Sequence, residues 1–321
     1  RPSAGLGSGV SGAPLRAAYE ASKRLGGHTL VFRHLVARRG EGTPGRSPFE
    51  TFDIPDDVHR RTTAAADRIL AGTTELFGQD LQLGDPPPWH AVIHTEGTWP
   101  AQDWWHLDLR SSERPGDVKW VWELGRHRHL VILARAAHLE PSDKRYLEAL
   151  ERQLRSWFDE NPPETGVHWY SNLEIALRSI AWLQILALTG ERLSPELRSD
   201  LWNHLRHSGS HLVADLPYTM ATMRNNHLLG DALGLIALGR AFGGTTGDRW
   251  YRIGDRVFNS QVARHVRDDG SMIEDSVSYH RFVLEMLSMR VVLGGASARV
   301  TEALRSAAQF LARLGALEGP V

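Results

Sequence analysis

Between Asp117 and Leu314 the chain is an almost unbroken series of helix-forming segments, and none of them has the alternating pattern of a strand. Apolar residues recur at three- and four-residue spacing in DVKWVWELGRHRHLVILARAAHLE, residues 117–140, and in SDKRYLEALERQLRSWFDEN, residues 142–161. Helices of about 15 to 20 residues joined by short connections pack as antiparallel hairpins. The pattern therefore predicts an all-α domain over residues 117–321.

Local signals mark where some of these helices begin and end. Ser171 precedes Glu174 by three residues, the spacing of a capping box, and Gly190 ends the same segment. Pro195 is well placed as the first residue of the next helix. Further helices are expected within residues 194–216, 223–239, 247–270, 276–295 and 298–314.

The first 116 residues have a different character and form a separate N-terminal region, residues 1–116. It consists in order of a Gly/Ser-rich arm (1–13), a basic helical stretch (14–39), a Gly/Pro loop (40–50), a helix (57–77) and an irregular Pro- and Trp-rich segment (77–117). Long irregular segments in compact domains are usually functional or disordered, and the aromatic content here argues against disorder. We expect this region to pack on the helical domain.

The composition excludes several classes of function. The formal net charge of -1 provides no general field for nucleic acid, and the absence of cysteine excludes disulfides, thiolate metal sites and cysteine nucleophiles from this chain. No stretch approaches the roughly 20 apolar residues that span a bilayer. Compartment and oligomeric state stay open.

The chain contains 11 tryptophans, and many of them occur among polar residues. For any single one, burial with a satisfied indole N–H is the commoner explanation, although amphipathic rings beside polar groups also suit stacking on sugars. A wholly buried role is hard to arrange for seven of them: Trp89, Trp99, Trp104, Trp105, Trp120, Trp122 and Trp169.

A polar cluster opens the apolar segment MRNNHLLGDALGLIALG, residues 223–239. One asparagine suffices as the N-cap of a helix. Asn225, Asn226 and His227 together leave at least one amide and one imidazole to face something other than their own backbone.

A second polar motif is DDGSMIEDSVSYHRF, residues 268–282. Asp269 and Gly270 predict a turn, and Tyr279 and His280 stand at the start of the next helix, so that a tyrosine hydroxyl lies near a helix end among acidic neighbours. Taken alone, Tyr279 is as well explained as a half-buried core tyrosine.

Charged pairs occur in two further helices, and each has a simple helix-stabilising explanation. Glu123 and Arg126, next to Trp122, have i,i+3 spacing, and Glu174 and Arg178 have i,i+4 spacing. Three histidines, His204, His207 and His211, share one helical face; because no carboxylate is spaced with them, a solvated polar face is favoured over a metal site.

Taken together, four segments resemble the heparinase II/III-like polysaccharide lyases, which include heparan sulfate lyases and oligoalginate lyases. They are KWVWELGRHRHLVILARA, NPPETGVHWYSNLEIALRSIAWL, MRNNHLLGDALGLIALG and DDGSMIEDSVSYHRF, on successive helices. The resemblance implies an incomplete (α/α) toroid of helical hairpins, with a β-sandwich that is not in this chain. It implies no cofactor here, and any structural metal belongs to that further domain.

The resemblance also implies a reaction and a site. Such enzymes cleave an acidic polysaccharide or oligosaccharide by β-elimination at a uronic acid, with Asn226 and His227 directed at the substrate carboxylate and Tyr279 transferring a proton. It suggests further substrate-binding residues on the same helices: Trp122, Glu123, Arg126, Trp169, Tyr170, Glu174, Arg178, Arg224 and His280. We expect Asn226, His227 and Tyr279 to meet on one concave surface near Trp122 or Trp169.

Two other classes remain open. An (α/α) glycoside hydrolase needs two carboxylates across the cleft, for which Glu123, Glu174, Glu274 and Asp275 are candidates without a diagnostic pair. A toroid that binds glycans without turnover is the other alternative.

Overall fold

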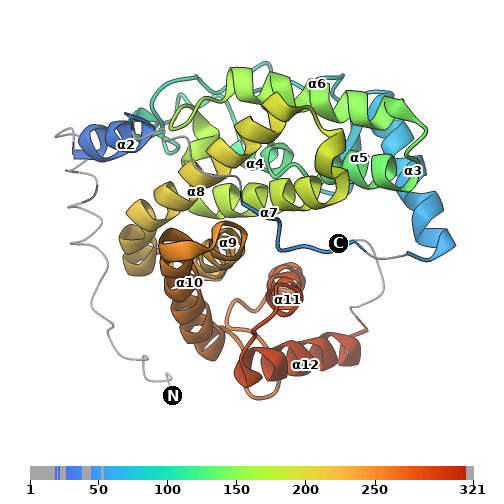
Figure 1. Ribbon diagram of the computed structural model, residues 1–321. Helices are drawn as coiled ribbons and strands as arrows, with labels where there is room; N and C mark the ends of the chain where they lie inside the picture. Colours follow the sequence, from blue (N-terminus) through green and yellow to red (C-terminus); the bar gives the residue numbers. More distant parts are fainter. Residues whose placement is uncertain (1–18, 20, 22–26, 38–44, 52–53, 316–321) are drawn as a thin grey trace.

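The computed structural model describes residues 19, 21, 27–37, 45–51 and 54–315, which form helical hairpins arranged along a curve (Figure 1). The hairpins are α5 (Arg128–Leu139) with α6 (Lys144–Glu160), α7 (Asn172–Thr189) with α8 (Pro195–Thr222), α9 (Asn226–Phe242) with α10 (Gly244–His265), and α11 (Val277–Val292) with α12 (Ala298–Arg313). The first helix of each hairpin contacts the first helix of the next. This is an incomplete (α/α) toroid, as the sequence predicts.

Helices α7 and α9 lie at the centre of the curve and are buried on nearly all sides. They approach closely because α9 carries glycine where it meets α7. A Cβ atom at Gly234 would stand 2.6 Å from the Cβ of Ala176, and one at Gly230 would stand 2.1 Å from a methyl carbon of Leu173. The close contact places the beginnings of both helices beside the same pocket.

Two helices of the toroid differ from the sequence expectation. The segment expected as one helix over residues 117–140 is divided into α4 (Val118–Gly125) and α5, because His127 adopts a left-handed conformation with φ of 61°. Helix α8 continues to Thr222, beyond its expected end at residue 216, and includes Pro217 within the helix. Proline removes one helical hydrogen bond but does not end this helix.

The caps of α7 and α9 also differ from each other. Asn225 is the N-cap of α9 and accepts a hydrogen bond from the His227 amide at 3.1 Å, as expected for an asparagine at this position. Ser171 occupies the N-cap of α7, but its side chain makes no capping hydrogen bond. The expected capping box is therefore wrong, because the Glu174 carboxylate binds Arg126 instead.

The N-terminal region packs against the toroid. Helix α2 (Gly27–Ala37) contacts α8, and α3 (Asp56–Leu70) contacts α5. The helix expected over residues 57–77 is wrong from residue 71 onward, because β1 (Thr73–Leu76) pairs antiparallel with β2 (Gln79–Gln82) after a turn. The remaining elements are short 3-10 turns: η1 (Trp104–His106), η2 (Val167–Trp169) and η3 (Gly190–Arg192). The Gly/Ser-rich arm lies outside the described residues.

Most tryptophans in polar sequence surroundings are buried, contrary to the expectation. Contacts with distant segments bury them: Trp89 packs on His127 and Trp157, and its indole donates to Ser156 at 3.0 Å. The core contains Trp89, Trp99, Trp104, Trp105 and Trp169, whereas Trp120 and Trp122 are half-buried.

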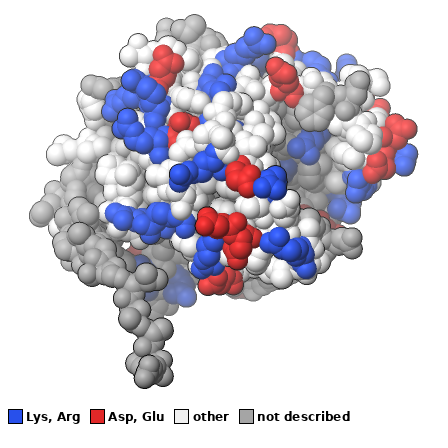
Figure 2. All heavy atoms as spheres, turned by 90° about the horizontal axis from the view of Figure 1, so that it is seen from below, with Lys and Arg blue, Asp and Glu red and all other residues white. Residues whose placement is uncertain are grey.

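Among the described residues, the segment Asn172–Arg192 is long and apolar enough to span a membrane by length and composition, although the sequence analysis expected no such stretch. Its most apolar window is 72% buried inside the protein, as in a core helix. On the face shown in Figure 2, basic and acidic side chains are interspersed and form no extended patch of one sign.

Candidate active site

Asn226 is held at the start of α9 by a carboxylate from another part of the chain. Its backbone N–H donates to one oxygen of Glu274 at 2.8 Å, and its side-chain amide donates to the other at 2.7 Å. Glu274 also lies 3.6 Å from the buried His265. Because both Glu274 oxygens accept from Asn226, the orientation of this amide is fixed and one of its two N–H groups is used.

His227 follows Asn226 and lines a pocket of about 820 Å³. Burial lowers the pKa of His227 below its usual value, while Glu174 and Glu274 oppose the shift and Arg126 adds to it. The imidazole is therefore neutral at pH 7. Glu174 lies in the first turn of α7 and Arg126 directly follows α4, so charges from two neighbouring helices act on His227.

Arg126 is engaged by two carboxylates. It binds Glu174 in a bidentate contact at 2.7 and 3.0 Å, and it also contacts Glu123. Burial opposes the charged form, but these carboxylates raise the pKa of Arg126. The pairs Glu123 with Arg126 and Glu174 with Arg178 were considered as helix-stabilising ion pairs, and only the first of them forms.

Tyr279 lies in the first turn of α11, and its side chain is 48% exposed. It follows Glu274 by five residues, so the loop that holds Asn226 leads directly into the helix of Tyr279. Tyr279 does not line the pocket that His227 lines. Asn226, His227 and Tyr279 were predicted to meet on one concave surface near Trp122 or Trp169. Of the three, only His227 lines this pocket, together with Trp122, and Asn226 is buried.

The remaining expected site residues divide into surface and core. Arg224 is exposed, next to the cluster, and donates to the Met220 carbonyl at 2.9 Å. Trp169 is buried, and His280 is buried between α11 and α12, where its ring stacks on Phe310. A direct contact of Trp169 or His280 with a substrate therefore does not agree with their positions.

Arg178 is also a core residue, only 1% exposed. Its guanidinium donates to the carbonyls of Gly125 and His168, and it lies 5.0 Å from the ring of Trp157. Burial lowers the pKa of Arg178 to about 9. The expectation that Arg178 binds substrate is corrected by this geometry, because its donors face the protein interior.

The pocket has a volume of about 820 Å³ and lies where α7, α8 and α9 meet the segment after η1. Trp122 and Tyr170 line it, and the Trp122 indole donates to the Val167 carbonyl at 3.0 Å. Other lining residues are Tyr19, Trp105, His106, Asp108, Arg110, Asn172, Asp215, Tyr218, Thr219 and Asp231. Aromatic rings interleaved with hydrogen-bonding groups suit a sugar.

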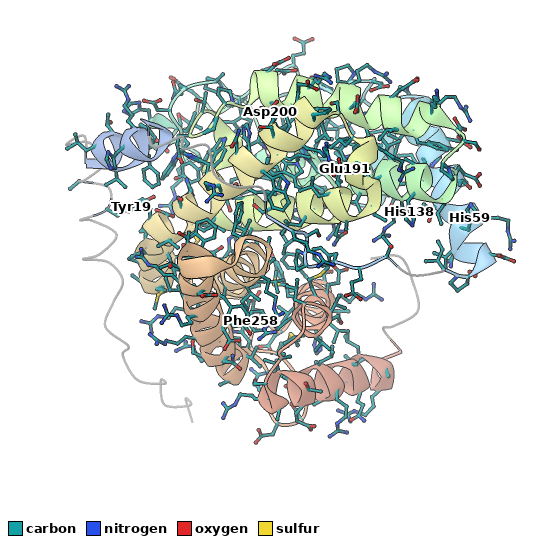
Figure 3. The ribbon with its side chains drawn as sticks, viewed as in Figure 1. Tyr19, His59, His138, Glu191, Asp200 and Phe258 are labelled. Atoms are coloured by element: carbon teal, nitrogen blue, oxygen red, sulfur yellow. The ribbon has the colours of Figure 1, made fainter. Side chains whose placement is uncertain are left out.

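The sequence analysis missed the acidic residues of this pocket. Asp231 is the only charged residue between His227 and Arg240, within an otherwise apolar helix, and that exception was the available signal. The Tyr19 hydroxyl donates to Asp215 at 2.9 Å, and Tyr19 lies beside α8 (Figure 3).

The carboxylates considered for a hydrolase are not arranged as a catalytic pair. Glu123 and Glu174 both bind Arg126, and Glu274 binds Asn226. Asp275 is exposed and pairs with Arg267 at 3.2 Å. None of these four acids lines the pocket.

The histidines of α8 do not form a solvated face as expected. His207 and His211 are buried and bind Glu164 at 2.5 and 2.9 Å, together with the indole of Trp104 at 2.6 Å. The carboxylate comes from a distant part of the sequence. Within the described residues, no group of three or more His, Asp or Glu side chains is arranged to hold a metal ion.

The hairpins and their order define the class, an incomplete (α/α) toroid with its pocket at the helix beginnings. The model of the family described as heparinase II/III N-terminus matches residues 98–305, more than half of the chain. The chain belongs to this family.

Two solved structures are similar in fold. The heparan sulfate lyase HepC from Pedobacter heparinus is 18% identical with a TM-score of 0.55, over 94% of this chain and 45% of that chain. A heparinase III with methylated lysines is 19% identical with a TM-score of 0.53, over 91% of this chain and 46% of that chain. The chain thus spans less than half the length of these structures. No curated protein matches it.

Proposed function

We propose that the chain is the helical part of a polysaccharide lyase that cleaves a uronic-acid-containing glycan by β-elimination. One observation carries the proposal: Glu274 fixes the amide of Asn226, the residue before His227, which lines the aromatic pocket, and the loop of Glu274 leads into the helix of Tyr279. Membership of the heparinase II/III N-terminal family supports the same class of reaction.

In this reaction the C5–H bond of the uronic acid breaks and its electron pair forms a C4=C5 double bond. The C4–O bond breaks after the C5–H bond, as the electron pair leaves the enolate to form the double bond, and the leaving oxygen takes up a proton. The carbanion at C5 develops beside a carboxylate, so the site must stabilise the charge that moves into that carboxylate as an enolate.

Asn226 and His227 are assigned to this carboxylate. His227 lines the pocket and donates from one N–H of its neutral imidazole, whereas Asn226 is only 3% exposed and acts through the small exposed part of its side chain. Both interactions strengthen as the enolate forms. Because burial keeps His227 neutral, it acts through hydrogen bonding without a full charge.

Tyr279 is assigned to proton transfer. Its hydroxyl is exposed, so it is accessible to a polymer that lies across the start of α11. A phenol can both accept the C5 proton, when ionised, and deliver a proton to the C4 oxygen. One residue suffices for both steps if the two groups leave from the same face of the sugar.

Substrate binding is assigned to the pocket and to its charged neighbours. Trp122 and Tyr170 provide stacking surfaces, and Arg224 is an exposed cation beside the cluster. Arg126 is already bound by Glu123 and Glu174, so it acts on the substrate indirectly. Its charge helps to lower the pKa of His227.

Product analysis on uronate polysaccharides tests the proposal with the full-length protein. An ultraviolet-absorbing unsaturated uronate is the expected product. A new reducing end without that absorbance would identify a glycoside hydrolase, and binding without turnover would identify a glycan-binding module; either result overturns the lyase assignment.

Tyr279→Phe tests the role of the hydroxyl. Turnover should fall by roughly 10²–10⁴-fold while binding is kept, because a proton carrier is lost with little change in shape. Tyr251→Phe is the matched control, since Tyr251 lies on α10 and does not line the pocket. Near-normal turnover by Tyr279→Phe would return this tyrosine to a packing role.

Esterified substrate separates the two assignments. Asn226→Ala and His227→Ala should each lower turnover on the free acid by roughly 10²–10³-fold, as for one lost oxyanion donor. Both variants should lose less on the methyl ester, whose carboxyl carries no charge in advance, whereas Tyr279→Phe should lose equally on both substrates. Equal losses for all three variants on the ester would contradict the division of roles.

A further inference from the structure

Helix α10 carries a row of arginines along its exposed face. The helix packs against α9, and Arg249, Arg252, Arg256 and Arg264 are exposed. Because a helix turns by about 100° per residue, these four side chains fall within about 120° of its circumference. The α10 arginine row extends from residue 249 to residue 264, about 22 Å along the helix axis.

The acidic residues of α10 do not neutralise this row. Asp248 and Asp255 each precede one of the arginines by one residue, which turns them about 100° away around the helix. Asp255 is bound to the buried Arg290 at 2.6 Å. Arg252 donates to the backbone carbonyl of Asp248 at 3.3 Å, and within the described part of the chain no arginine of the row forms an ion pair.

Exposed arginines on other helices are paired instead. Arg155 of α6 lies 3.9 Å from Glu151, and Arg305 of α12 binds Glu302 at 2.6 Å. Charges of opposite sign commonly alternate in this way on solvated helix faces. The formal net charge of the whole chain is -1, so four unpaired arginines on one helix concentrate positive charge locally. The α10 arginine row therefore suits an anionic partner.

The side chains between the arginines restrict the class of partner. The other exposed side chains on this face are small: Thr245, Thr246, Ser260 and Ala263. Over α10, which the structure describes in full, no aromatic ring is exposed for stacking on nucleic acid bases, and no large apolar side chain is exposed for insertion into a membrane. Guanidinium groups bind oxyanions in bidentate contacts, and the neighbouring hydroxyls suit sugar hydroxyls. An anionic polysaccharide fits this face best.

The row ends close to the candidate active site. Helices α9 and α10 are antiparallel neighbours, so the C-terminal end of α10 lies beside the beginning of α9 (Figure 1). Arg264 is followed by His265, which lies 3.6 Å from Glu274, the carboxylate that holds Asn226. A polymer bound along the row therefore has one end near this site.

We propose that the α10 arginine row is a second binding surface for an anionic polysaccharide, which holds the polymer outside the pocket while one of its uronates reaches the site. The link to cleavage rests on the proposed lyase function. The attraction acts between exposed charges, so its contribution to binding falls as the salt concentration rises.

Dextran sulfate tests the row separately from the lyase, because it is anionic but contains no uronate to cleave. Its binding to the full-length protein is measured by calorimetry, with neutral dextran as the blank. The test variant combines Arg249→Gln, Arg252→Gln, Arg256→Gln and Arg264→Gln. Binding should weaken about 10- to 100-fold, since each exposed ion pair contributes roughly two- to threefold.

The matched control removes the same amount of charge elsewhere. It replaces exposed arginines that are paired with acids: Arg61→Gln, Arg145→Gln, Arg155→Gln and Arg305→Gln. This control should bind dextran sulfate within about twofold of the unmodified protein, because salt screens distant charges. Equal weakening in both variants would show a general effect of net charge and overturn the proposal. Stronger binding of double-stranded DNA than of dextran sulfate at equal charge would assign the row to nucleic acid and also overturn it.

Kinetics on a uronate polymer test the link to the site. The test variant should raise KM for the long polymer by about 10- to 100-fold at unchanged kcat, because the row adds a second point of attachment. Both constants should stay unchanged for a short oligosaccharide that cannot reach from the pocket to the row. An equal rise in KM for both lengths would contradict a second binding surface.

The outcomes separate this surface from the proposed function. Binding of dextran sulfate that depends on the row, without unsaturated product from any uronate polymer, would keep the surface and remove the lyase. Unsaturated product, with no effect of the test variant on binding or KM, would remove the surface and keep the lyase.

Discussion

Glu164 and Asp231 are two buried carboxyl groups whose surroundings shift their pKa values in opposite directions. Glu164 receives hydrogen bonds from His207, His211 and Trp104. Burial would raise its pKa, but the two histidines outweigh burial and lower the pKa of Glu164 to about 2. Among the described residues no histidine or indole N–H donates to Asp231; Thr219 and Asn172 oppose the shift, but burial raises the pKa of Asp231 well above its usual value.

This difference distinguishes a carboxyl group that holds the fold together from one that lies at a pocket. The three donors of Glu164 come from α8 and from the segment that contains η1, so this carboxylate joins distant parts of the chain. Its hydrogen-bonding capacity is used within the protein. Asp231 lies at a pocket instead, and within the described part of the chain its carboxyl oxygens accept no hydrogen bond of ordinary geometry.

The largest effect expected from this comparison is on stability. Glu164→Ala should lower the free energy of unfolding by about 3–5 kcal/mol, because His207 and His211 lose their buried carboxylate. Urea denaturation measures the loss. Glu191→Ala, whose side chain is 89% exposed, is the control and should change stability by less than about 1 kcal/mol. A small loss for both variants would end the architectural interpretation of Glu164.

The sequence could not predict this cluster, although it contains all the residues. Helical spacing placed His207 and His211 on one face, but it contained no information about a partner 43 residues earlier. Glu164 also has a left-handed backbone with φ of 66°, which no local pattern indicates. Expectation failed where contacts between distant segments decide whether a polar side chain is exposed.

The helical hairpins could be predicted because their signals are local. Apolar periodicity located the hairpins, and Pro195 and Asn225 begin or cap helices where expected. The site was intermediate: the sequence singled out Asn226 and His227, but the binding of Asn226 by Glu274 depends on the folded loop before α11. Trp169 was mistaken for an accessible residue, because its burial depends on tertiary packing.

Substitution of Glu274 should have the second-largest effect, and this effect is on turnover. Its hydrogen bonds are made within the protein, but they orient a proposed site residue. Glu274→Gln offers Asn226 one acceptor oxygen in place of two, so the amide loses its fixed orientation. Turnover should fall by about 10²–10³-fold with a smaller change in KM. Asp275→Asn, an exposed neighbour, is the control.

A double variant distinguishes orientation from simple stability. Asn226→Asp combined with Glu274→Gln exchanges donor and acceptor, so the hydrogen bond can form again and stability should recover. Activity should stay low, because a carboxylate would then face the substrate carboxylate. Recovery of turnover together with stability would show that only the fold depends on this pair.

Lowering the pH should change the contributions of His129 and Asp231 to stability in opposite directions. Burial lowers the pKa of His129 from 6.5 to about 4, so the folded state binds fewer protons than the unfolded state. Its contribution to stability is complete above about pH 6.5 and is lost as the pH falls toward 4, with about 2 kcal/mol lost at pH 5. Thermal unfolding between pH 4 and 8 measures this loss, and His129→Gln should reduce it.

Asp231 should show the reverse dependence. Because its pKa is raised in the folded state, its contribution is complete below the unfolded value of 3.8 and declines as the pH rises. Asp231→Asn removes this titration, so the variant should gain stability relative to the unmodified protein between pH 4 and 8. A parallel pH dependence in both proteins would contradict a raised pKa of Asp231.

The smallest effect is expected at Asn225. Asn225 and Asn226 are adjacent at the start of α9, and one serves the fold while the other is assigned to the site. Asn225 uses its side-chain oxygen within the protein to cap α9. Asn225→Ala should therefore lower the free energy of unfolding by about 1 kcal/mol, as for other lost N-caps, and leave turnover within about twofold. Asn226→Ala should do the opposite and affect turnover most. Unfolding and turnover are measured for both variants, to test whether Asn225 serves the fold and Asn226 the site. A large loss of turnover in Asn225→Ala at unchanged stability would assign Asn225 to the site as well.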